Sequence, residues 1–461
     1  MIATTATREP PRPRSSALSQ TLRYVRDPLP LLDECRRTLG EIFTLRLVGN
    51  GDWVFLSEPQ HLRTMFTGDA GVLHAGEANT SIFGALTGRS SAFNLDGDAH
   101  LARRRLLSKP FHGDRMHEYT GVMRTLAERT VAGWPLDRTF ALHPQMQQTA
   151  LEVILRSIFG LERGADSAKL AALLTRLADD GVRSPLLLTP SLQWDLGRFS
   201  PWGRITHLVR ETDAALHAEI RRRRAEPADA ARRDILSILL AVRDEQGRPL
   251  TDGDIRDELV TMLLAGHETT GTALAWTMER LLAHPEAYAR AEAECDAVTG
   301  GGPVEREHVP KLVYLDAVIS ETLRLRPIMP VGGVRKLTAP FEVGGFTVPK
   351  GATLANCMYL ALLRPQAFPE PHAFRPERFL GKAPDLYEWT PFGGGVRRCL
   401  GMAFAYWEMK VVLATVLKSV RLRLDAPSVR AMRRGFFLAP EGGPPVRVTE
   451  RRVASAPQAG V

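Results

Sequence analysis

Cysteine is scarce in this chain of 461 residues: there are 4, at positions 35, 295, 357 and 399, and no two form a CxxC pair. Their scatter excludes a disulfide framework and a zinc ribbon, and it favours a reducing compartment. The sequence also lacks the roughly 20 consecutive apolar residues of a membrane helix and the apolar core of a signal peptide. It therefore predicts a soluble, cytoplasmic protein without a membrane span.

A nucleic-acid-binding signature is absent as well. The net charge is +8, but basic clusters such as Arg221–Arg224 have no aromatic neighbours. We interpret them as solvated helix faces, and the modest positive balance favours an acidic protein partner. No internal repeat or clear linker divides the chain. We therefore expect one domain over residues 20–450, with flexible tails at 1–19 and 451–461.

The most informative segment that is present is 392–401, which reads Phe-Gly-Gly-Gly-Val-Arg-Arg-Cys-Leu-Gly. An apolar-patterned helix is expected to start beside it, at Leu400. A thiol at Cys399 then meets free backbone N–H groups and the positive end of the helix dipole, and Arg397 and Arg398 add positive charge. Both effects favour the thiolate, which is the form of cysteine that binds metals.

Glycines surround this cysteine at positions 393, 394, 395 and 401. Without side chains they leave space for a flat, bulky group against the backbone, and the arrangement suits an axial thiolate under a haem iron. The alternative is a small buried cysteine beside a glycine-rich turn. The cysteine and glycines by themselves leave both interpretations open.

The local patterns predict a mainly helical fold with a small β region. Alternating residues around a glycine turn predict a hairpin at 42–56, and a second hairpin is expected at 341–348. Helical patterns dominate between residues 98 and 326. The longest helix should begin at a cap formed by Thr251 and continue to His284, which is about 50 Å.

The middle of this helix, residues 265–270, reads Ala-Gly-His-Glu-Thr-Thr. Glycine and threonine weaken a helix, and a hydroxyl that bonds back to a carbonyl can open a groove in it. The pair His267–Glu268 starts an HExxH zinc motif, but Gly271 occupies the place of the second histidine, so this motif is excluded. Taken alone, Glu268 and Thr269 are equally consistent with a surface acid and an isolated hydroxyl.

Three further charged patterns are weak individually. Glu321 and Arg324 lie three residues apart on an amphipathic helix, and the segment 374–379, Phe-Arg-Pro-Glu-Arg-Phe, follows about fifty residues later. His100 and Arg104 are four residues apart on an expected helix. Each of these, like Arg335 after a short apolar stretch, would more commonly be a solvated surface group.

In this order, the motifs resemble the cytochrome P-450 family over nearly the whole chain. The family's haem loop, Phe-x-x-Gly-x-Arg-x-Cys-x-Gly, is matched at Phe392, Gly395, Arg397, Cys399 and Gly401. The helix motif of the family, Ala/Gly-Gly-x-Asp/Glu-Thr-Thr/Ser, is matched by residues 265–270. The resemblance implies the cytochrome P-450 fold, a single large helical domain with haem b between the long central helix and the helix after the cysteine loop.

The resemblance also implies roles for individual residues. Cys399 is the axial iron ligand, Thr269 hydrogen-bonds dioxygen at the haem and Glu268 relays protons. Ala265, Phe392 and Gly401 border the haem, and its propionates are bound by His100, Arg104, Arg335 and Arg397. Glu321, Arg324 and Arg378 form a buried ion network with a structural role.

The implied function is a monooxygenase that hydroxylates a hydrophobic small molecule with O2. A terpenoid or a fatty acid is favoured, with a steroid or macrolide as further options. Electrons are expected from an acidic ferredoxin with its NAD(P)H-dependent reductase, docked on Arg103, Arg105 and Arg398 of a monomer. The family's substrate pocket corresponds to residues 75–95, 185–203 (with Leu186, Leu187, Trp194 and Phe199), 328–331 and Phe436–Phe437.

Three other classes compete with this function. A haem-thiolate peroxygenase or isomerase would be expected to lack the acid–threonine pair, which is present at Glu268 and Thr269. A non-catalytic haem sensor or carrier would need neither Thr269 nor an open pocket. A non-haem hydrolase would need a nucleophile constellation, and the sequence contains none.

Overall fold

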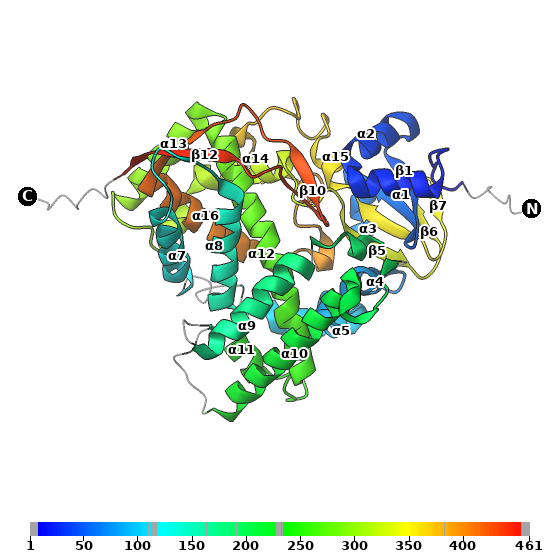
Figure 1. Ribbon diagram of the computed structural model, residues 1–461. Helices are drawn as coiled ribbons and strands as arrows, with labels where there is room; N and C mark the ends of the chain where they lie inside the picture. Colours follow the sequence, from blue (N-terminus) through cyan, green and yellow to red (C-terminus); the bar gives the residue numbers. More distant parts are fainter. Residues whose placement is uncertain are drawn as a thin grey trace, which may run out of the picture.

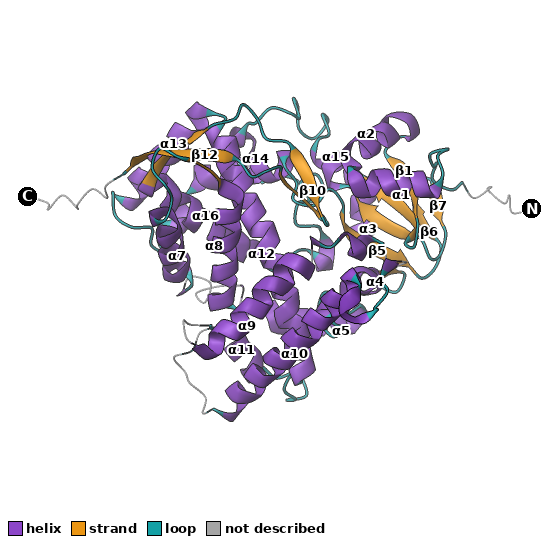
Figure 2. Cartoon of the chain, in the orientation of Figure 1, coloured by secondary structure: helices purple, strands orange, loops and turns teal. Residues whose placement is uncertain are grey.

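The computed structural model describes residues 8–108, 111, 118–161, 165–181, 183–189, 192–226, 232, 234–381 and 383–452. Helices make up most of the molecule, and the largest sheet lies at the side where the N-terminus emerges (Figures 1 and 2). This confirms the prediction of a mainly helical fold with a small β region.

The helices are distributed along the whole described chain. They are α1 (Ala17–Arg26), α2 (Pro28–Leu39), α3 (Pro59–Thr67), α4 (Ala75–Thr87), α5 (Gly97–Ser108), α7 (Thr120–Ala132), α8 (Leu142–Ser157), α9 (Ala165–Arg176), α10 (Pro201–Ala225), α11 (Ile235–Ala241), α12 (Asp252–Leu282), α13 (Pro285–Thr299), α14 (Val313–Leu325), α15 (Met358–Leu362) and α16 (Met402–Ser419).

The strands form one five-stranded sheet and three smaller units. The large sheet has the order β1-β2-β8-β5-β3, a second sheet has the order β4-β12-β9, and β6-β7 and β10-β11 are hairpins. Both predicted hairpins are confirmed as antiparallel pairs, β1 with β2 and β6 with β7. The strands are β1 (Ile42–Leu47), β2 (Gly51–Leu56), β3 (Leu73–His74), β4 (Thr139–Ala141), β5 (Gly332–Leu337), β6 (Phe341–Val343), β7 (Phe346–Val348), β8 (Thr353–Asn356), β9 (Val420–Leu424), β10 (Ala431–Arg434), β11 (Phe437–Pro440) and β12 (Pro445–Arg451).

Helix α12 is the longest element, with 31 residues, and it packs against α8, α10, α14 and α16. Its first turn is closed by a capping box in which Thr251 and Asp254 each accept a backbone N–H from the other. The helix ends at Leu282, two residues before the predicted end. The cap at Thr251 fixes where α12 begins. Because neighbouring helices surround α12, its position decides which of its side chains face the interior.

The N-terminal segment expected to be a tail contacts the sheet over its described part. The carbonyl of Arg8 accepts the N–H of Thr347 at 3.0 Å, and that of Pro11 accepts the N–H of Thr44 at 2.8 Å. Helix α1 already begins at Ala17, so the boundary expected at residue 19 falls inside a helix. Residues 1–7 and 453–461 of the expected tails lie outside the described residues.

Most buried apolar side chains form one core around α12, α8 and α16, and a smaller apolar cluster lies under the large sheet. Within the described ranges, every helix is too short or too polar to cross a membrane.

Candidate active site

A cavity of about 470 Å³ lies between α12 and the cysteine loop that precedes α16. The sequence predicted that both segments border one site, and the structure brings them together. The predicted residues that line the cavity are Ala265, Thr269, Phe392, Arg397, Cys399 and Gly401. His100, Arg104 and Arg335 line it as well. Among the predicted catalytic and cofactor-binding residues, Glu268 alone is absent from this wall.

Cys399 is held in place by its own backbone. Its N–H donates to the carbonyl of Phe392 at 2.9 Å, and α16 begins three residues later, at Met402. The side chain of Cys399 is exposed to the cavity, where the surrounding protein limits its hydration and raises the pKa of the thiol. The Gly401 backbone N–H and the charges of Arg104 and Arg398 act in the opposite direction. A bound metal cation would add the remaining stabilisation that a thiolate needs at this place.

The four glycines of the cysteine loop serve two different purposes. A Cβ at Gly393 or Gly401 would meet no other atom within 4 Å, so these two positions border open space. A Cβ at Gly394 or Gly395 would instead collide with Phe66 of α3. The expectation that all four glycines make room for a flat group is therefore wrong for Gly394 and Gly395, which allow the loop to pack on α3.

Arg335 and Arg397 approach the cavity with different partners. Arg335 is 4% exposed and donates to the carbonyls of Gly333 and Val334 at 3.0 and 2.9 Å. Burial lowers the pKa of Arg335 to about 10. Arg397 forms an ion pair with Asp96 at 2.6 Å.

The cations of the cavity wall outnumber their carboxylate partners. Within the described ranges, Arg104 and Arg335 form no ion pair with a carboxylate, and burial lowers the pKa of Arg104 and that of His100. Cations in such surroundings are costly unless an anion approaches them. The two propionates of a haem fit this need, and the open space at Gly393 and Gly401 fits a planar ring beside Cys399.

Thr269 faces the cavity from the middle of α12. Its Oγ1 donates to the carbonyl of Ala265, one turn earlier, at 2.5 Å. This is the back-bond to a carbonyl that the sequence predicted. The hydroxyl oxygen keeps lone pairs with which it can accept a proton or a hydrogen bond from a group in the cavity.

Glu268 lies outside the cavity wall and is 1% exposed. Its Oε2 accepts hydrogen bonds from Nε and Nη2 of Arg183 at 3.1 and 3.0 Å. Arg183 also pairs with Asp179 at 3.0 Å. The structure therefore separates the predicted acid–threonine pair, because Thr269 borders the cavity while Glu268 is held by Arg183.

Two histidines lie near this ion pair. His143 Nδ1 is 3.3 Å from Nη1 of Arg434, and its Nε2 is 3.0 Å from the hydroxyl of Thr272. Arginine can only donate, so Nδ1 is the acceptor and the proton of a neutral ring is on Nε2. Burial lowers the pKa of His143 to about 3 and that of His267 to about 4. No cluster of three or more His, Cys, Asp or Glu side chains that could hold a metal ion exists in the described part of the chain.

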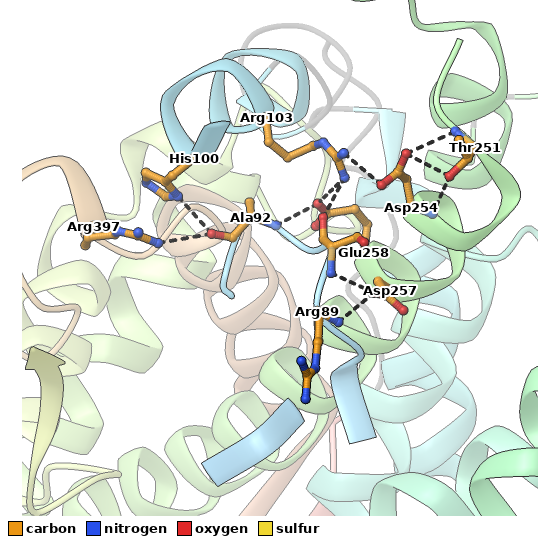
Figure 3. A network of polar contacts seen from close by, with 10 residues as sticks. Arg89, Ala92, His100, Arg103, Thr251, Asp254, Asp257, Glu258 and Arg397 are labelled. Carbon is orange, nitrogen blue, oxygen red and sulfur yellow. Dashed lines mark hydrogen bonds and ion pairs between the residues drawn. The ribbon is translucent and has the colours of Figure 1, made fainter. Parts of the chain in front are cut away.

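Arg103, expected as a surface contact for a redox partner, is turned inward. Its guanidinium pairs with Asp254 at 2.9 Å and Glu258 at 3.1 Å, and its side chain is 13% exposed (Figure 3). That expectation is wrong, because α5 packs this face against the start of α12. Arg105 is exposed but pairs with Glu245, and Arg398 is half-buried.

The predicted ion network behind the site is confirmed. Glu321 and Arg324 are fully buried and form two hydrogen bonds, of 2.7 and 2.8 Å. Nε of Arg378 lies 3.5 Å from Glu321, whose carboxylate also accepts the N–H of Arg375. Arg324 donates in addition to the carbonyls of Leu362, Pro371 and Ala373. The network thus ties α14 to the chain that precedes the cysteine loop.

The predicted substrate wall is confirmed in part. Side chains from 75–95 and 328–331 line the cavity, together with Leu187, Phe436 and Phe437. Trp194 and Phe199 do not line it; they are 66% and 96% exposed. The resemblance to the family placed them in the pocket wrongly, because a matched position in an irregular segment does not indicate which way its side chain faces.

The sequence did not identify Arg183, Glu258 or His143 as neighbours of the site. Arg183 and Glu268 are separated by 85 positions, and Glu258 and Ala92 by 166. No local spacing connects such pairs, since their contacts depend on how separate helices pack.

Comparisons with known proteins agree with this geometry. The family model described as Cytochrome P-450 matches residues 10–443. The cytochrome P-450 135B1 of Mycobacterium tuberculosis is 40% identical over 99% of this chain and 94% of its own length. The cytochrome P-450 138 of the same organism is 36% identical over 96% of this chain and 97% of its own length.

The fold is also found among solved structures. The retinoic acid-bound cyanobacterial CYP120A1 superposes with a TM-score of 0.83 and 24% identity, covering 97% of this chain and 100% of that chain. The cysteine loop, the central helix and the match over almost the whole sequence lead to one conclusion. The chain belongs to the cytochrome P-450 family and is a haem-dependent monooxygenase.

Proposed function

We propose that this monooxygenase binds haem b through Cys399 and hydroxylates a hydrophobic small molecule with O2. The observation that carries the proposal is that Cys399 and Thr269, from two separate elements, line one cavity whose wall also holds four potential cations. Cys399 would be the axial ligand, and His100, Arg104, Arg335 and Arg397 would hold the propionates.

Haem with a thiolate ligand supplies the activation of dioxygen. The chain's own contribution is the control of protons and water. Thr269 Oγ1 donates to the carbonyl of Ala265 at 2.5 Å, and its hydroxyl would rotate away from that carbonyl to donate to an acceptor in the cavity. Glu268 is the nearest acid in sequence; after its carboxylate leaves Arg183 it would take up a proton from water and pass it to Thr269.

The walls of the cavity support a hydrophobic substrate. Phe83, Ile328, Phe436 and Phe437 present apolar surface to it, and Phe83 and Phe436 lie with ring centroids 4.6 Å apart. Apolar walls also exclude water from the reacting centre. Among hydrophobic classes we favour a terpenoid or a fatty acid, with a steroid or macrolide as alternatives.

We further propose that electrons arrive from a separate acidic ferredoxin and its NAD(P)H-dependent reductase. The net charge of +8 supports an acidic partner, and Arg398, beside Cys399, remains a candidate contact. Electron transfer should then slow as ionic strength rises, because salt screens the approach of opposite charges. A rate that is indifferent to salt would contradict electrostatic docking.

The first experiment is an absorbance titration of the purified ferric protein with terpenoids, fatty acids, steroids and macrolides. A thiolate-type Soret band that shifts toward high spin with one class would support the cofactor and identify the substrate class. A thiolate spectrum without any shift would reject these substrate classes and keep the cofactor. No haem spectrum after reconstitution would overturn the proposal.

A further inference from the structure

The backbone of one residue, Ala92, connects the central helix to His100 and Arg397 of the cavity wall (Figure 3). Its N–H donates to Oε1 of Glu258 on α12 at 2.7 Å. Its carbonyl accepts from Nδ1 of His100 at 2.8 Å and from Nη1 of Arg397 at 3.1 Å. The loop that contains Ala92 joins α4 to α5 and lines the cavity.

The backbone of Ala92 explains why this connection matters. Its N–H and its carbonyl belong to two successive planar peptide groups, which meet at the Cα of Ala92. Glu258 anchors the N–H side of the residue, and His100 and Arg397 share the carbonyl on the other side. If the anchor at the N–H is lost, rotation about the two backbone bonds of Ala92 would move the carbonyl away from its two donors.

Glu258 is an unusual residue for this task because it is 2% exposed. It pairs with Arg103 at 3.1 Å, and Arg103 also donates to the carbonyl of Ser90 at 2.8 Å. Even so, burial raises the pKa of Glu258 to about 7. A buried carboxylate is costly, and the proton pathway proposed above does not use this one.

The neighbouring residue on α12 provides an internal comparison. Oδ2 of Asp257 accepts the N–H groups of Arg89 and Ser90 at 2.9 and 2.8 Å. Asp257 therefore clamps the same loop with the same chemistry, two to three residues before Ala92. Of these two carboxylates, only Glu258 binds the residue whose carbonyl is shared by His100 and Arg397.

We propose that Glu258 is a positioning residue for the cofactor: by anchoring the backbone of Ala92 it orients His100 and Arg397 toward the cofactor's carboxylates. This inference rests on the proposed function, because it requires haem in the cavity. With this role for Glu258, the first turns of α12 help to hold the cofactor, while Thr269 in the middle of the helix faces the proposed oxygen-binding side of the cavity.

The test compares Glu258→Gln with Asp257→Asn, each as the haem-loaded protein. The measured quantity is the rate of haem transfer to an excess of apomyoglobin at pH 8.5, followed at the Soret band. Glutamine keeps the shape but loses the charge that holds Ala92 and Arg103. We expect Glu258→Gln to lose haem about tenfold faster than the wild type, the scale of one lost hydrogen bond to a charged group, and Asp257→Asn to stay within about threefold.

A pH series separates positioning from a general loss of packing. The charged groups around Glu258 are Arg103 of α5 and Asp254 and Asp257 of α12. Below about pH 7 Glu258 itself becomes protonated and resembles glutamine in charge. The haem-loss rate of Glu258→Gln divided by that of Asp257→Asn should therefore be largest at pH 8.5 and approach one at pH 5.5.

Hydrogen–deuterium exchange gives a second measurement that does not depend on cofactor release. In Glu258→Gln the amide of Ala92 should exchange faster, while the amides of Arg89 and Ser90 remain protected; Asp257→Asn should show the reverse. Equal haem-loss rates in both variants, or a rate ratio independent of pH, would overturn the inference. Failure to bind haem at all would instead overturn the proposed function, so the two failures are distinguishable.

Discussion

Arg183 donates two hydrogen bonds to a single oxygen of Glu268, Oε2, at 3.0 and 3.1 Å. The other oxygen, Oε1, is buried without a hydrogen-bond partner among the described residues. Glu268 is almost fully buried, whereas 26% of the Arg183 side chain is exposed. The acid of the expected acid–threonine pair is thus held by a cation from the segment after α9, on a face of α12 that does not border the cavity.

The first prediction concerns the strength of this ion pair. A double-mutant cycle of Arg183→Gln and Glu268→Gln, measured by urea unfolding, should give a coupling energy of about 1–3 kcal/mol. This is less than the ~3–5 kcal/mol for breaking a fully buried pair, because Arg183 is partly exposed. Asp179→Asn is the control, because Asp179 pairs with the same arginine but its own side chain is 38% exposed. Its coupling energy with Arg183→Gln should be less than about 1 kcal/mol. Additive effects of the two main substitutions would contradict the coupling.

The second prediction concerns the hydroxyl of Thr269. Thr269→Ala removes the proton donor on the cavity wall while leaving the helix intact, since its only described hydrogen bond goes to Ala265. We expect electrons to be diverted to hydrogen peroxide, so that the product formed per NAD(P)H falls by about tenfold. This is less than the 10²–10⁴-fold contribution of a positioned proton donor, because water partly replaces the hydroxyl.

Thr269→Ser is the matched control, because it keeps a hydroxyl at the same place and should retain most of the coupling. The measurement is the ratio of product and peroxide to NAD(P)H consumed. Unchanged ratios in Thr269→Ala would assign the proton donor to another group.

Local patterns in the sequence were sufficient for some parts of the fold and not for others. The capping box at Thr251 and the hairpin at 42–56 depend on neighbours in the chain, and both were predicted correctly. The direction in which Arg103 faces was predicted wrongly. A helical pattern shows which residues share a face but does not identify the element that covers it, and here that element is the start of α12.

The candidate site shows the same division. Cys399, the proposed ligand, and the Glu321–Arg324 pair were identified from contiguous motifs; the structure places Cys399 at the cavity and confirms the buried pair. The partner of Glu268 lies 85 positions earlier, in a segment without a regular pattern. No physical rule of local spacing could have joined these two residues.

The third prediction addresses the fully buried pair of Glu321 and Arg324. Arg324→Met would leave the Glu321 carboxylate buried beside three backbone carbonyls that have lost their donor. We expect a loss of about 3–5 kcal/mol in unfolding free energy, a large part of the roughly 5–15 kcal/mol available to a protein. Poor expression in the folded form would be the first sign.

Arg378→Ala is the control for this network. Its guanidinium lies farther from Glu321, at 3.5 Å, and its side chain is 14% exposed. A loss of only about 1 kcal/mol is therefore expected from urea unfolding. Similar losses for Arg378→Ala and Arg324→Met would contradict the assignment of Arg324 as the centre of the network.

The last prediction concerns acid stability and the two buried histidines. Burial lowers the pKa of His143 to about 3 and that of His267 to about 4, below the ordinary value of 6.5. In the unfolded chain both rings take up protons as the pH falls through 6.5, but in the folded protein they remain neutral. Stability from these groups is therefore fully present above about pH 7 and is lost as the pH falls toward 4.

At pH 4.5 the loss should reach roughly 3 kcal/mol for each histidine, from two pH units at about 1.4 kcal/mol each. His143→Gln keeps a donor for Thr272 and cannot take up a proton, so its unfolding free energy should fall less steeply between pH 7 and 4.5 than that of the wild type. The measurement is urea unfolding at several pH values in this range. His207 on α10, a half-buried histidine that pairs with Glu211, provides the control, and His207→Gln should change the slope less than His143→Gln does. Parallel slopes for His143→Gln and the wild type would show that His143 is already charged in the folded protein.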